Sequence, residues 1–308
     1  MTKRKKRKWF LSILVIISII YILVKIASFT TEIINPIPQK DNFALIPITG
    51  LITYNGAESL FTDTPSIKET INYIETANKS KDIKGIILLI DSPGGTVLAS
   101  KDLAKAIEQI EKPNVVLIRQ MGASGAYWAA SASDYIIADE VSMIGSIGVI
   151  GSYLNFNNLL EDYNVSYERL IAGQYKDMGS PFKELTDEER AKFQGTIDDI
   201  YDIFIRDIAE KRGLSIEDTR GLATGEIYLG KEAMEKGLID KIGDKTTAIE
   251  YLKEQTNTTD YLIVEYREDK TMLERLLSAE RFYWIGVGMG ESLKNIKTEN
   301  TVRDIGLY

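Results

Sequence analysis

The run GIILLIDSPGG, residues 85–95, decides the fold predicted for this chain. Its first part, Gly85–Asp91, is almost continuously apolar, which is typical of a β-strand buried on both faces of a parallel sheet. The turn residues SPGG come next, and Val97–Glu111 then has the pattern of a helix. The run therefore predicts a strand that leads through a tight turn into a helix, which is the start of a βαβ unit.

The same alternation of strand and helix continues along the chain. Asn114–Arg119 (NVVLIR) predicts a second buried strand, Met121–Ser133 (MGASGAYWAASAS) a turn into a helix, and Tyr135–Asp139 (YIIAD) a third strand. Before the run, Phe43–Tyr54 predicts a strand or hairpin, and Pro65–Lys79 has the apolar spacing of an amphipathic helix. Strands that alternate with helices predict an α/β fold with parallel pairing.

The second half of the chain predicts one more strand, a long helix and an extension. Tyr167–Gly173 (YERLIAG) has the pattern of a strand, and Asp187–Gly213 that of a long helix opened by a capping box at Thr186. The extension covers residues 266–308. Its apolar island, Phe282–Gly290, could pack into the core or could contact a groove or the membrane.

A basic block and an apolar stretch open the chain. Residues 1–8 carry six Lys or Arg and no acid, and Trp9–Phe29 follows. The uncharged run Trp9–Val24 has 16 residues, which exceeds the roughly 7–15 of a cleaved signal peptide's apolar region. We therefore expect an uncleaved transmembrane helix over Trp9–Phe29, with a short tether at residues 30–42. Basic residues before the helix predict a cytoplasmic N-terminus and an extracytoplasmic body.

Histidine and cysteine are both absent from the sequence. Their absence excludes Ser-His-Asp and Cys-His mechanisms, His-ligated zinc or haem, disulfides and iron–sulfur clusters. We predict neither a metal site nor a cofactor. Beyond residues 1–8 the chain carries 31 basic and 45 acidic residues, a net charge of −14. Such an acidic body argues against a nucleic-acid partner, because phosphate binding needs a basic surface.

The turn at the end of the first buried strand is a candidate anion site. Gly94 and Gly95 allow backbone N–H groups to point into open space just before a helix begins. Adjacent N–H groups in this position can hold an anion or an oxyanion. The alternative is an ordinary connection between a strand and a helix.

Ser124 is the candidate nucleophile. It lies in Gly122–Ala126 (GASGA), among residues too small to shield its hydroxyl. The pattern resembles the nucleophile elbow of hydrolases, although Ala126 replaces the second glycine of G-x-S-x-G. The N–H of Gly125 is the natural partner of the Gly95 N–H in an oxyanion hole. Small residues also allow close helix packing, which is the alternative interpretation.

A serine nucleophile needs a base, and without histidine a desolvated lysine can serve. Lys176 is the candidate because it follows a predicted strand, in the segment GQYKDMGSP. Tyr175 and Met178 could help to shield its amine from water. The alternative is a surface lysine that pairs with Asp177.

Taken together, the motifs resemble the signal peptide peptidase A family in its short, single-copy form. The matching segments lie between about residues 43 and 250: SPGG, GASGAYW, GSIGVIG, AGQYKDMGSPFKELTDEE and ATGEIYLGKEAMEKGLIDKIGD. The resemblance implies a Clp/crotonase-like α/β spiral of βαβ units, with a peptidase domain over residues 43–265. It also implies a Ser-Lys dyad of Ser124 as nucleophile and Lys176 as general base.

The remaining site residues also follow from the resemblance. Backbone N–H groups of Gly95 and Gly125 would form the oxyanion hole, and Gly94 and Ser146 would line the active site. The family's short members form homo-oligomeric rings on the membrane, in which neighbouring protomers supply the serine and the lysine. The implied substrates are remnant signal peptides and similar apolar peptides.

Two other functions stay open at this point. The chain could be a related membrane serine protease that acts on other membrane-protein substrates. It could also be a catalytically inactive crotonase-like scaffold that binds apolar peptides, although Ser124 and Lys176 both lie in matching contexts.

Overall fold

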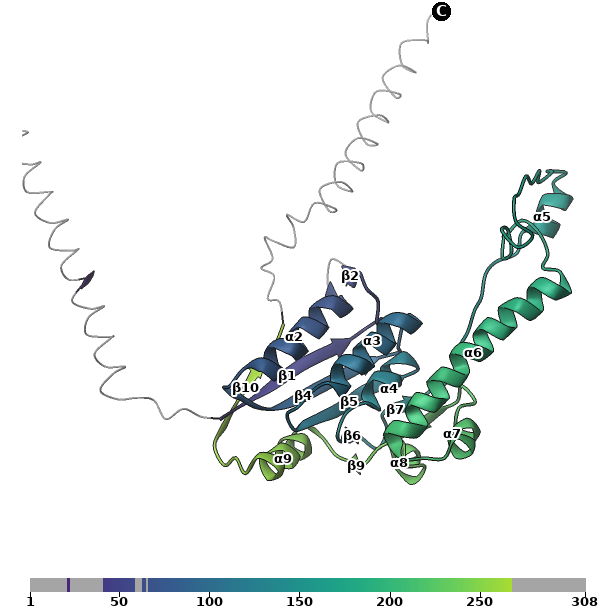
Figure 1. The fold of residues 1–308 in the computed structure, drawn as a ribbon. Helices are drawn as coiled ribbons and strands as arrows, with labels where there is room; N and C mark the ends of the chain where they lie inside the picture. Colours follow the sequence, from purple (N-terminus) through teal and green to yellow (C-terminus); the bar gives the residue numbers. More distant parts are fainter. Residues whose placement is uncertain (1–20, 23–40, 59–62, 65, 268–308) are drawn as a thin grey trace, which may run out of the picture. The chain divides into compact units, whose positions relative to one another are not determined.

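The computed structural model describes residues 21–22, 41–58, 63–64 and 66–267 (Figure 1). Asn42–Thr259 and Ile263–Tyr308 group into one compact unit, and Met1–Asp41 with Asp260–Leu262 into another. All six candidate site residues, from Gly94 to Lys176, belong to the first unit.

The predicted membrane helix Trp9–Phe29 lies outside the described residues, apart from Tyr21 and Ile22, which are helical. The basic block 1–8 and most of the tether and of the C-terminal extension also lie outside them. Within the described part of the chain, no helix combines the length and the apolar character needed to cross a membrane.

A sheet with the strand order β10-β1-β4-β5-β6-β9 forms the centre of the fold. The pairs β1/β4, β4/β5, β5/β6 and β6/β9 are parallel, which confirms the predicted α/β fold. The bounds of these strands are β1 Asp41–Thr49, β4 Ile83–Ser92, β5 Asn114–Ala123, β6 Ile136–Ala138, β9 Lys241–Ile242 and β10 Tyr261–Glu265.

A short branch makes the sheet mixed. β7, Met143–Gly145, pairs in parallel with the end of β5, and β8, Ile227–Leu229, pairs antiparallel with β7. A separate antiparallel pair joins β2, Ala57–Glu58, to β3, Asp63–Thr64.

Helices cover both faces of the sheet, with α2 and α3 on one face and α9 on the other (Figure 1). Ile86, Leu88 and Ile90 of β4 belong to the core beneath α2 and α3. On the opposite face, Gly85 lies so close to Leu252 of α9 that a β-carbon would come within 3.0 Å of it. Burial on both faces explains why this strand is continuously apolar.

The helices are α2 Ile67–Lys79, α3 Val97–Glu108, α4 Gly125–Ala130, α5 Asn157–Asp162, α6 Asp187–Arg212, α7 Ile216–Leu222, α8 Gly230–Glu235 and α9 Lys245–Thr256.

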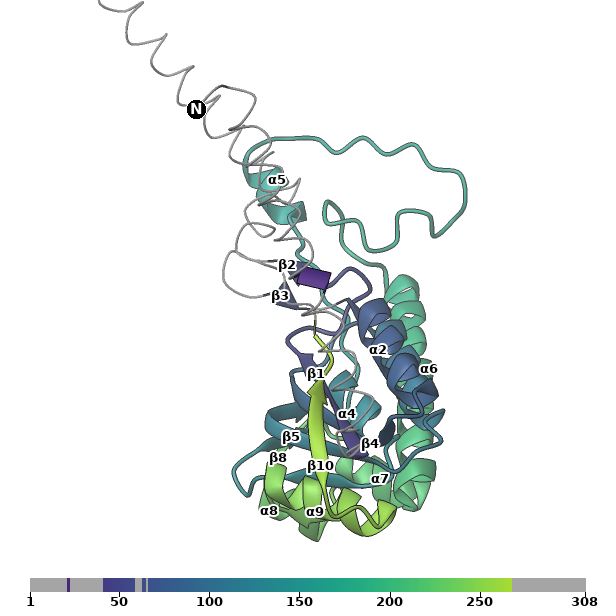
Figure 2. The same cartoon turned by 90° about the vertical axis from the view of Figure 1, so that its left-hand side faces the viewer.

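The segment that connects β7 to α6 differs from the prediction. Residues 150–185, which we call the arm, contain only the short helix α5, and the rest is irregular (Figure 2). The predicted strand Tyr167–Gly173 is therefore wrong, because no neighbouring strand pairs with it and its residues are exposed. The long helix is confirmed as α6, and its N-cap Thr186 forms the predicted capping box with Glu189.

Candidate active site

Ser124 occupies the turn between β5 and α4, which begins at Gly125. Its backbone has φ 54° and ψ −126°, a conformation that non-glycine residues rarely adopt. The Ser124 amide donates a hydrogen bond to the carbonyl of Gly145 at 2.7 Å, which helps to hold the turn. Strain at a serine between a strand and a helix is the geometry of a nucleophile elbow.

Ser124 and Ser146 lie side by side because β5 and β7 pair in parallel. Ala123 of β5 is paired with Gly145 of β7. Ser124 and Ser146 directly follow these two paired residues. Ser146 also has a positive φ, 48°, and its amide donates to the carbonyl of Glu226 at 2.7 Å. Two serines in uncommon backbone conformations thus follow the carboxyl ends of neighbouring strands.

The SPGG turn packs directly against the Ser124 turn. Gly94 has φ +98°, and a β-carbon there would lie 2.7 Å from the Gly125 nitrogen. A β-carbon on Gly125 would in turn lie 2.1 Å from Oγ of Ser100. Both positions therefore require glycine for space. Gly94 supports the site from behind and does not line its cavity.

The amides of Gly95 and Gly125 converge beside Ser124. Gly95 is held in place by Ile52, whose amide donates to the carbonyl of Gly94 at 2.9 Å. A β-carbon on Gly125 would lie 3.4 Å from the Gly95 nitrogen, so the two glycines are close neighbours. Among the described residues, no group accepts a hydrogen bond from either amide. Two unpaired donors next to a serine can stabilise negative charge that develops on a bound carbonyl oxygen.

These groups open into one cavity of about 640 Å³. Ser124, Gly95, Gly125 and Ser146 all line it, so the structure brings together four of the six predicted site residues.

Mainly apolar side chains from three helices form the walls of the cavity. Val97 comes from α3, Trp128 from α4, and Ile197, Tyr201 and Phe204 from α6. The Trp128 and Phe204 rings stack with centroids 4.3 Å apart, and Nε1 of Trp128 donates to Asp207 at 3.1 Å. These contacts fix α6 against α4 and complete the cavity. The contribution of α6 to the cavity wall was not predicted, because this helix is far from Ser124 in sequence.

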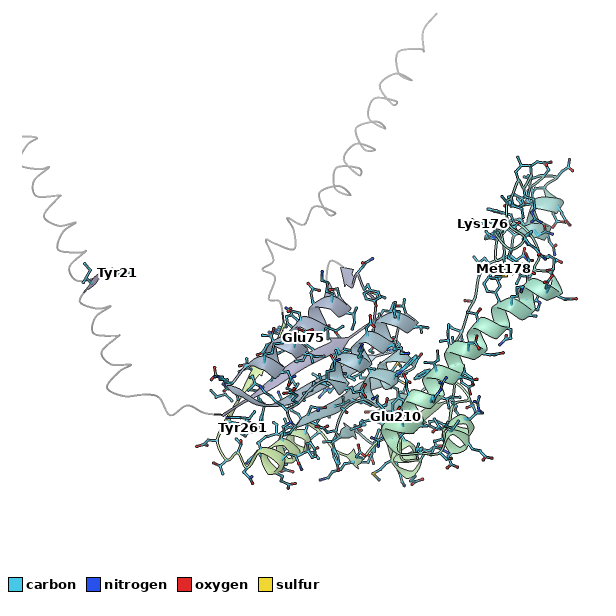
Figure 3. The ribbon with its side chains drawn as sticks, in the orientation of Figure 1. Tyr21, Glu75, Lys176, Met178, Glu210 and Tyr261 are labelled. Carbon is cyan, nitrogen blue, oxygen red and sulfur yellow. The ribbon has the colours of Figure 1, made fainter. Side chains whose placement is uncertain are left out.

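Within one chain, Lys176 lies away from Ser124. Figure 3 shows Lys176 and Met178 at the α5 end of α6, away from the sheet. The hydroxyl of the adjacent Tyr175 donates to Glu188, in the first turn of α6. The α6 residues that line the Ser124 cavity run from Gln194 to Phe204. They lie 6 to 16 residues beyond Glu188 on the same helix, which corresponds to about 9–24 Å along the axis.

Lys176 is an exposed lysine in the single chain. The ion pair with Asp177, which was the alternative interpretation of Lys176, does not form, and Asp177 instead pairs with Arg169 at 2.7 Å and with Lys183 at 3.7 Å. Within the described residues, no side chain forms an ion pair or hydrogen bond with Lys176. Tyr175 is bound to Glu188 and lies under Lys192, 4.5 Å from its Nζ.

The described residues that line the cavity carry little charge. Asp198, which accepts a hydrogen bond from Gln194 at 2.8 Å, is the one charged side chain among the described lining residues. Over the described ranges, no group of three or more His, Cys, Asp or Glu side chains could hold a metal ion.

Sequence reasoning also missed Ser100, a completely buried serine that lines the same cavity. The one available signal was its position, one helical turn after the SPGG turn.

Relatives of this chain are named as proteases. "Putative protease MJ0651" of Methanocaldococcus jannaschii is 36% identical over 255 residues, which cover 80% of each chain. "Putative signal peptide peptidase SppA" of Enterococcus faecium is 32% identical over 79% of this chain and 72% of its own. A solved mutant of the 1510-N membrane-bound stomatin-specific protease is 15% identical, with a TM-score of 0.47, and covers 75% of this chain and 99% of its own.

The model of peptidase family S49 matches residues 106–259, a range that includes Ser124 and Lys176. Together with the identity to the two relatives, this match confirms the resemblance drawn from the motifs. The chain therefore belongs to peptidase family S49.

Proposed function

We propose that this peptidase is a membrane-anchored serine endopeptidase that cuts apolar peptides with a Ser124–Lys176 dyad. The observation that carries the proposal is the strained Ser124 beside two unpaired amides, in a cavity lined by both apolar and polar side chains. For the fold we propose the Clp/crotonase-like spiral, which the parallel βαβ units support.

The reaction proceeds through an acyl-enzyme. Oγ of Ser124 attacks the peptide carbonyl, and its proton passes to the neutral amine of Lys176. The amides of Gly95 and Gly125 donate to the oxyanion. When the C–N bond breaks, the lysine ammonium gives the proton to the leaving amine. Water then attacks the ester and loses a proton to the lysine, and the resulting ammonium returns this proton to Oγ of Ser124 as the ester C–O bond breaks.

The base comes from a second copy of the chain. Among the described cavity residues there is no Lys or Arg, and Lys176 lies on the exposed arm. Six apolar side chains on the arm are more than half exposed: Ile150, Leu154, Leu159, Tyr163, Val165 and Leu170. Exposed apolar surface of this extent is typical of an interaction site. A neighbouring protomer that covers the arm would bury Lys176 and favour its uncharged form.

This arrangement implies a homo-oligomeric ring in which each active site takes its serine from one protomer and its lysine from the next. Leu170 is completely exposed in the single chain, and its burial in the ring would stabilise the assembly. A transmembrane helix at Trp9–Phe29 would hold the ring at the membrane surface, with the catalytic domain on the extracytoplasmic side.

The substrates proposed are remnant signal peptides and similar apolar peptides. Tyr201, Ile197 and Val97 offer apolar surface in the cavity that Ser124 also lines. An apolar substrate would also exclude water from the dyad, which strengthens the electrostatic interactions there.

Hydrolysis of a leucine-rich fluorogenic peptide tests the proposal. The full-length chain in detergent micelles would be compared with Ser124→Ala, Lys176→Ala and the control Lys68→Ala, an exposed lysine of α2 outside the cavity. We expect turnover by the wild type and by Lys68→Ala, and its loss in both dyad variants. Equal turnover in all four would refute the dyad, and binding without turnover by the wild type would favour the inactive scaffold.

A mixture of variants tests the shared site. Ser124→Ala and Lys176→Ala chains, refolded or expressed together, should regain activity because some sites combine an intact serine with an intact lysine. Mixed rings, verified by two affinity tags, that stay inactive would refute a site shared between protomers.

A further inference from the structure

Ser100 carries a buried hydroxyl that the proposed dyad does not use. The residue lies in the first turn of α3 and is 0% exposed. Its Oγ has no hydrogen-bond partner among the described residues. A serine inside a helix commonly bonds to the carbonyl four residues back. Here the Ser100 amide donates to the Thr96 carbonyl at 3.0 Å, but the hydroxyl does not.

The unpaired hydroxyl lies next to both oxyanion donors. A β-carbon on Gly125 would be 2.1 Å from Oγ of Ser100 and 3.4 Å from the nitrogen of Gly95. Ser100 and Ser124 also line the same cavity. A buried polar group without a partner is costly, so it persists where another role compensates for the cost.

We propose that the Ser100 hydroxyl is a third hydrogen-bond donor to the oxyanion that forms when Ser124 attacks a peptide carbonyl. The inference rests on the proposed function, because it needs that reaction. A hydroxyl can rotate its proton toward a charge as the charge develops. Since the bond forms only when the oxygen is negative, it stabilises the transition state more than the bound substrate.

Ser100→Ala in the full-length chain tests this role. Alanine keeps the β-carbon and removes only the hydroxyl. We expect kcat to fall by about 10- to 100-fold with KM unchanged, somewhat below the effect of a main oxyanion donor in other hydrolases. The melting temperature should stay the same or rise, because the substitution deletes an unpaired buried group.

Ser131→Ala is the matched control. Ser131 is also buried, at 1% exposure, but its hydroxyl donates to the carbonyl of Trp128 at 2.8 Å. This variant should have a lower melting temperature and an unchanged kcat. Ser100→Ala is thus expected to lower kcat without lowering the melting temperature, and Ser131→Ala to lower the melting temperature without changing kcat.

A peptide aldehyde separates donation from packing. The aldehyde forms a tetrahedral adduct with the Ser124 hydroxyl, and the adduct oxygen occupies the oxyanion position. Ser100→Ala should weaken aldehyde binding by about the factor lost in kcat, while a peptide carboxamide of the same sequence binds unchanged.

The outcomes distinguish this inference from the function on which it rests. A kcat within twofold of the wild type, or equal weakening of aldehyde and carboxamide, would overturn the role of Ser100 and leave the Ser124 mechanism standing. Wild-type turnover that Ser124→Ala does not abolish would overturn the proposed function and the inference together.

Discussion

The strained backbone of Ser124 predicts that its replacement by glycine stabilises the protein while abolishing its activity. Ser124 has φ 54° and ψ −126°, and a non-glycine residue in such a conformation costs about 1–3 kcal/mol. Glycine adopts a positive φ without this cost. Alanine retains the β-carbon and therefore the strain, so Ser124→Ala is the reference that also lacks the hydroxyl.

The expected gain follows from two opposing contributions. Relief of strain favours the folded glycine variant by about 1–3 kcal/mol, whereas the greater freedom of glycine in the unfolded chain opposes it by about 0.4–1 kcal/mol. The net stabilisation of Ser124→Gly over Ser124→Ala is then about 0–2.6 kcal/mol, with a midpoint of about 1.3 kcal/mol. For a domain of this size the midpoint corresponds to a rise in melting temperature of about 3–5 °C.

Thermal unfolding followed by circular dichroism, at one scan rate and in one detergent, measures the difference. Asn164→Gly is the control, because Asn164 has a similar φ, 55°, in a conformation that asparagine tolerates. That variant should change the melting temperature little. A Ser124→Gly chain that melts at or below the temperature of Ser124→Ala would show that the turn is not strained and would refute the reasoning.

Three further predictions concern the walls, the arm and the response to acid. Phe204→Ala removes a buried ring that stacks on Trp128 and should lower the free energy of unfolding by about 3–5 kcal/mol. If urea unfolding shows a decrease of less than about 1 kcal/mol, this contact does not hold α6 in place. Leu170→Asp on the exposed arm should reduce the mass of the assembly in light scattering without lowering the monomer's melting temperature, and an unchanged mass would argue against the arm as the interface. A hydrogen bond from Lys183 holds the pKa of the Glu189 carboxyl below its ordinary 4.5. The stability that this carboxylate contributes is therefore present above pH 4.5 and is lost as the pH falls through the lowered pKa. Glu189→Gln should flatten this part of the pH–stability curve, and a curve identical to that of the wild type would contradict the assignment.

The turns that carry the site could be predicted because their signals are local. Apolar strands followed by SPGG and GASGA indicate strand-to-helix connections, and the parallel sheet places the ends of β4 and β5 next to each other. The requirement for glycine at positions 94 and 125 itself comes from tertiary contacts, because the two turns approach each other closely and Gly125 approaches Ser100 of α3.

The arm could not be predicted in the same way. Tyr167–Gly173 has the pattern of a strand, but a strand needs a neighbour to satisfy its backbone groups, and no described segment pairs with it. The local pattern predicts which conformation a segment can adopt, and tertiary pairing decides whether it does.

By itself, the sequence determined the α/β class, the position of the nucleophile turn and the absence of a histidine or cysteine mechanism, because these depend on residue types and short-range spacing. Only the tertiary structure decided which groups share the cavity. It added Phe204 and Ser100 to the surroundings of Ser124 and separated Lys176 from them. The physical reason is that α6 is a rigid helix whose first turn holds Tyr175 through Glu188, whereas the residues of α6 that line the cavity begin at Gln194.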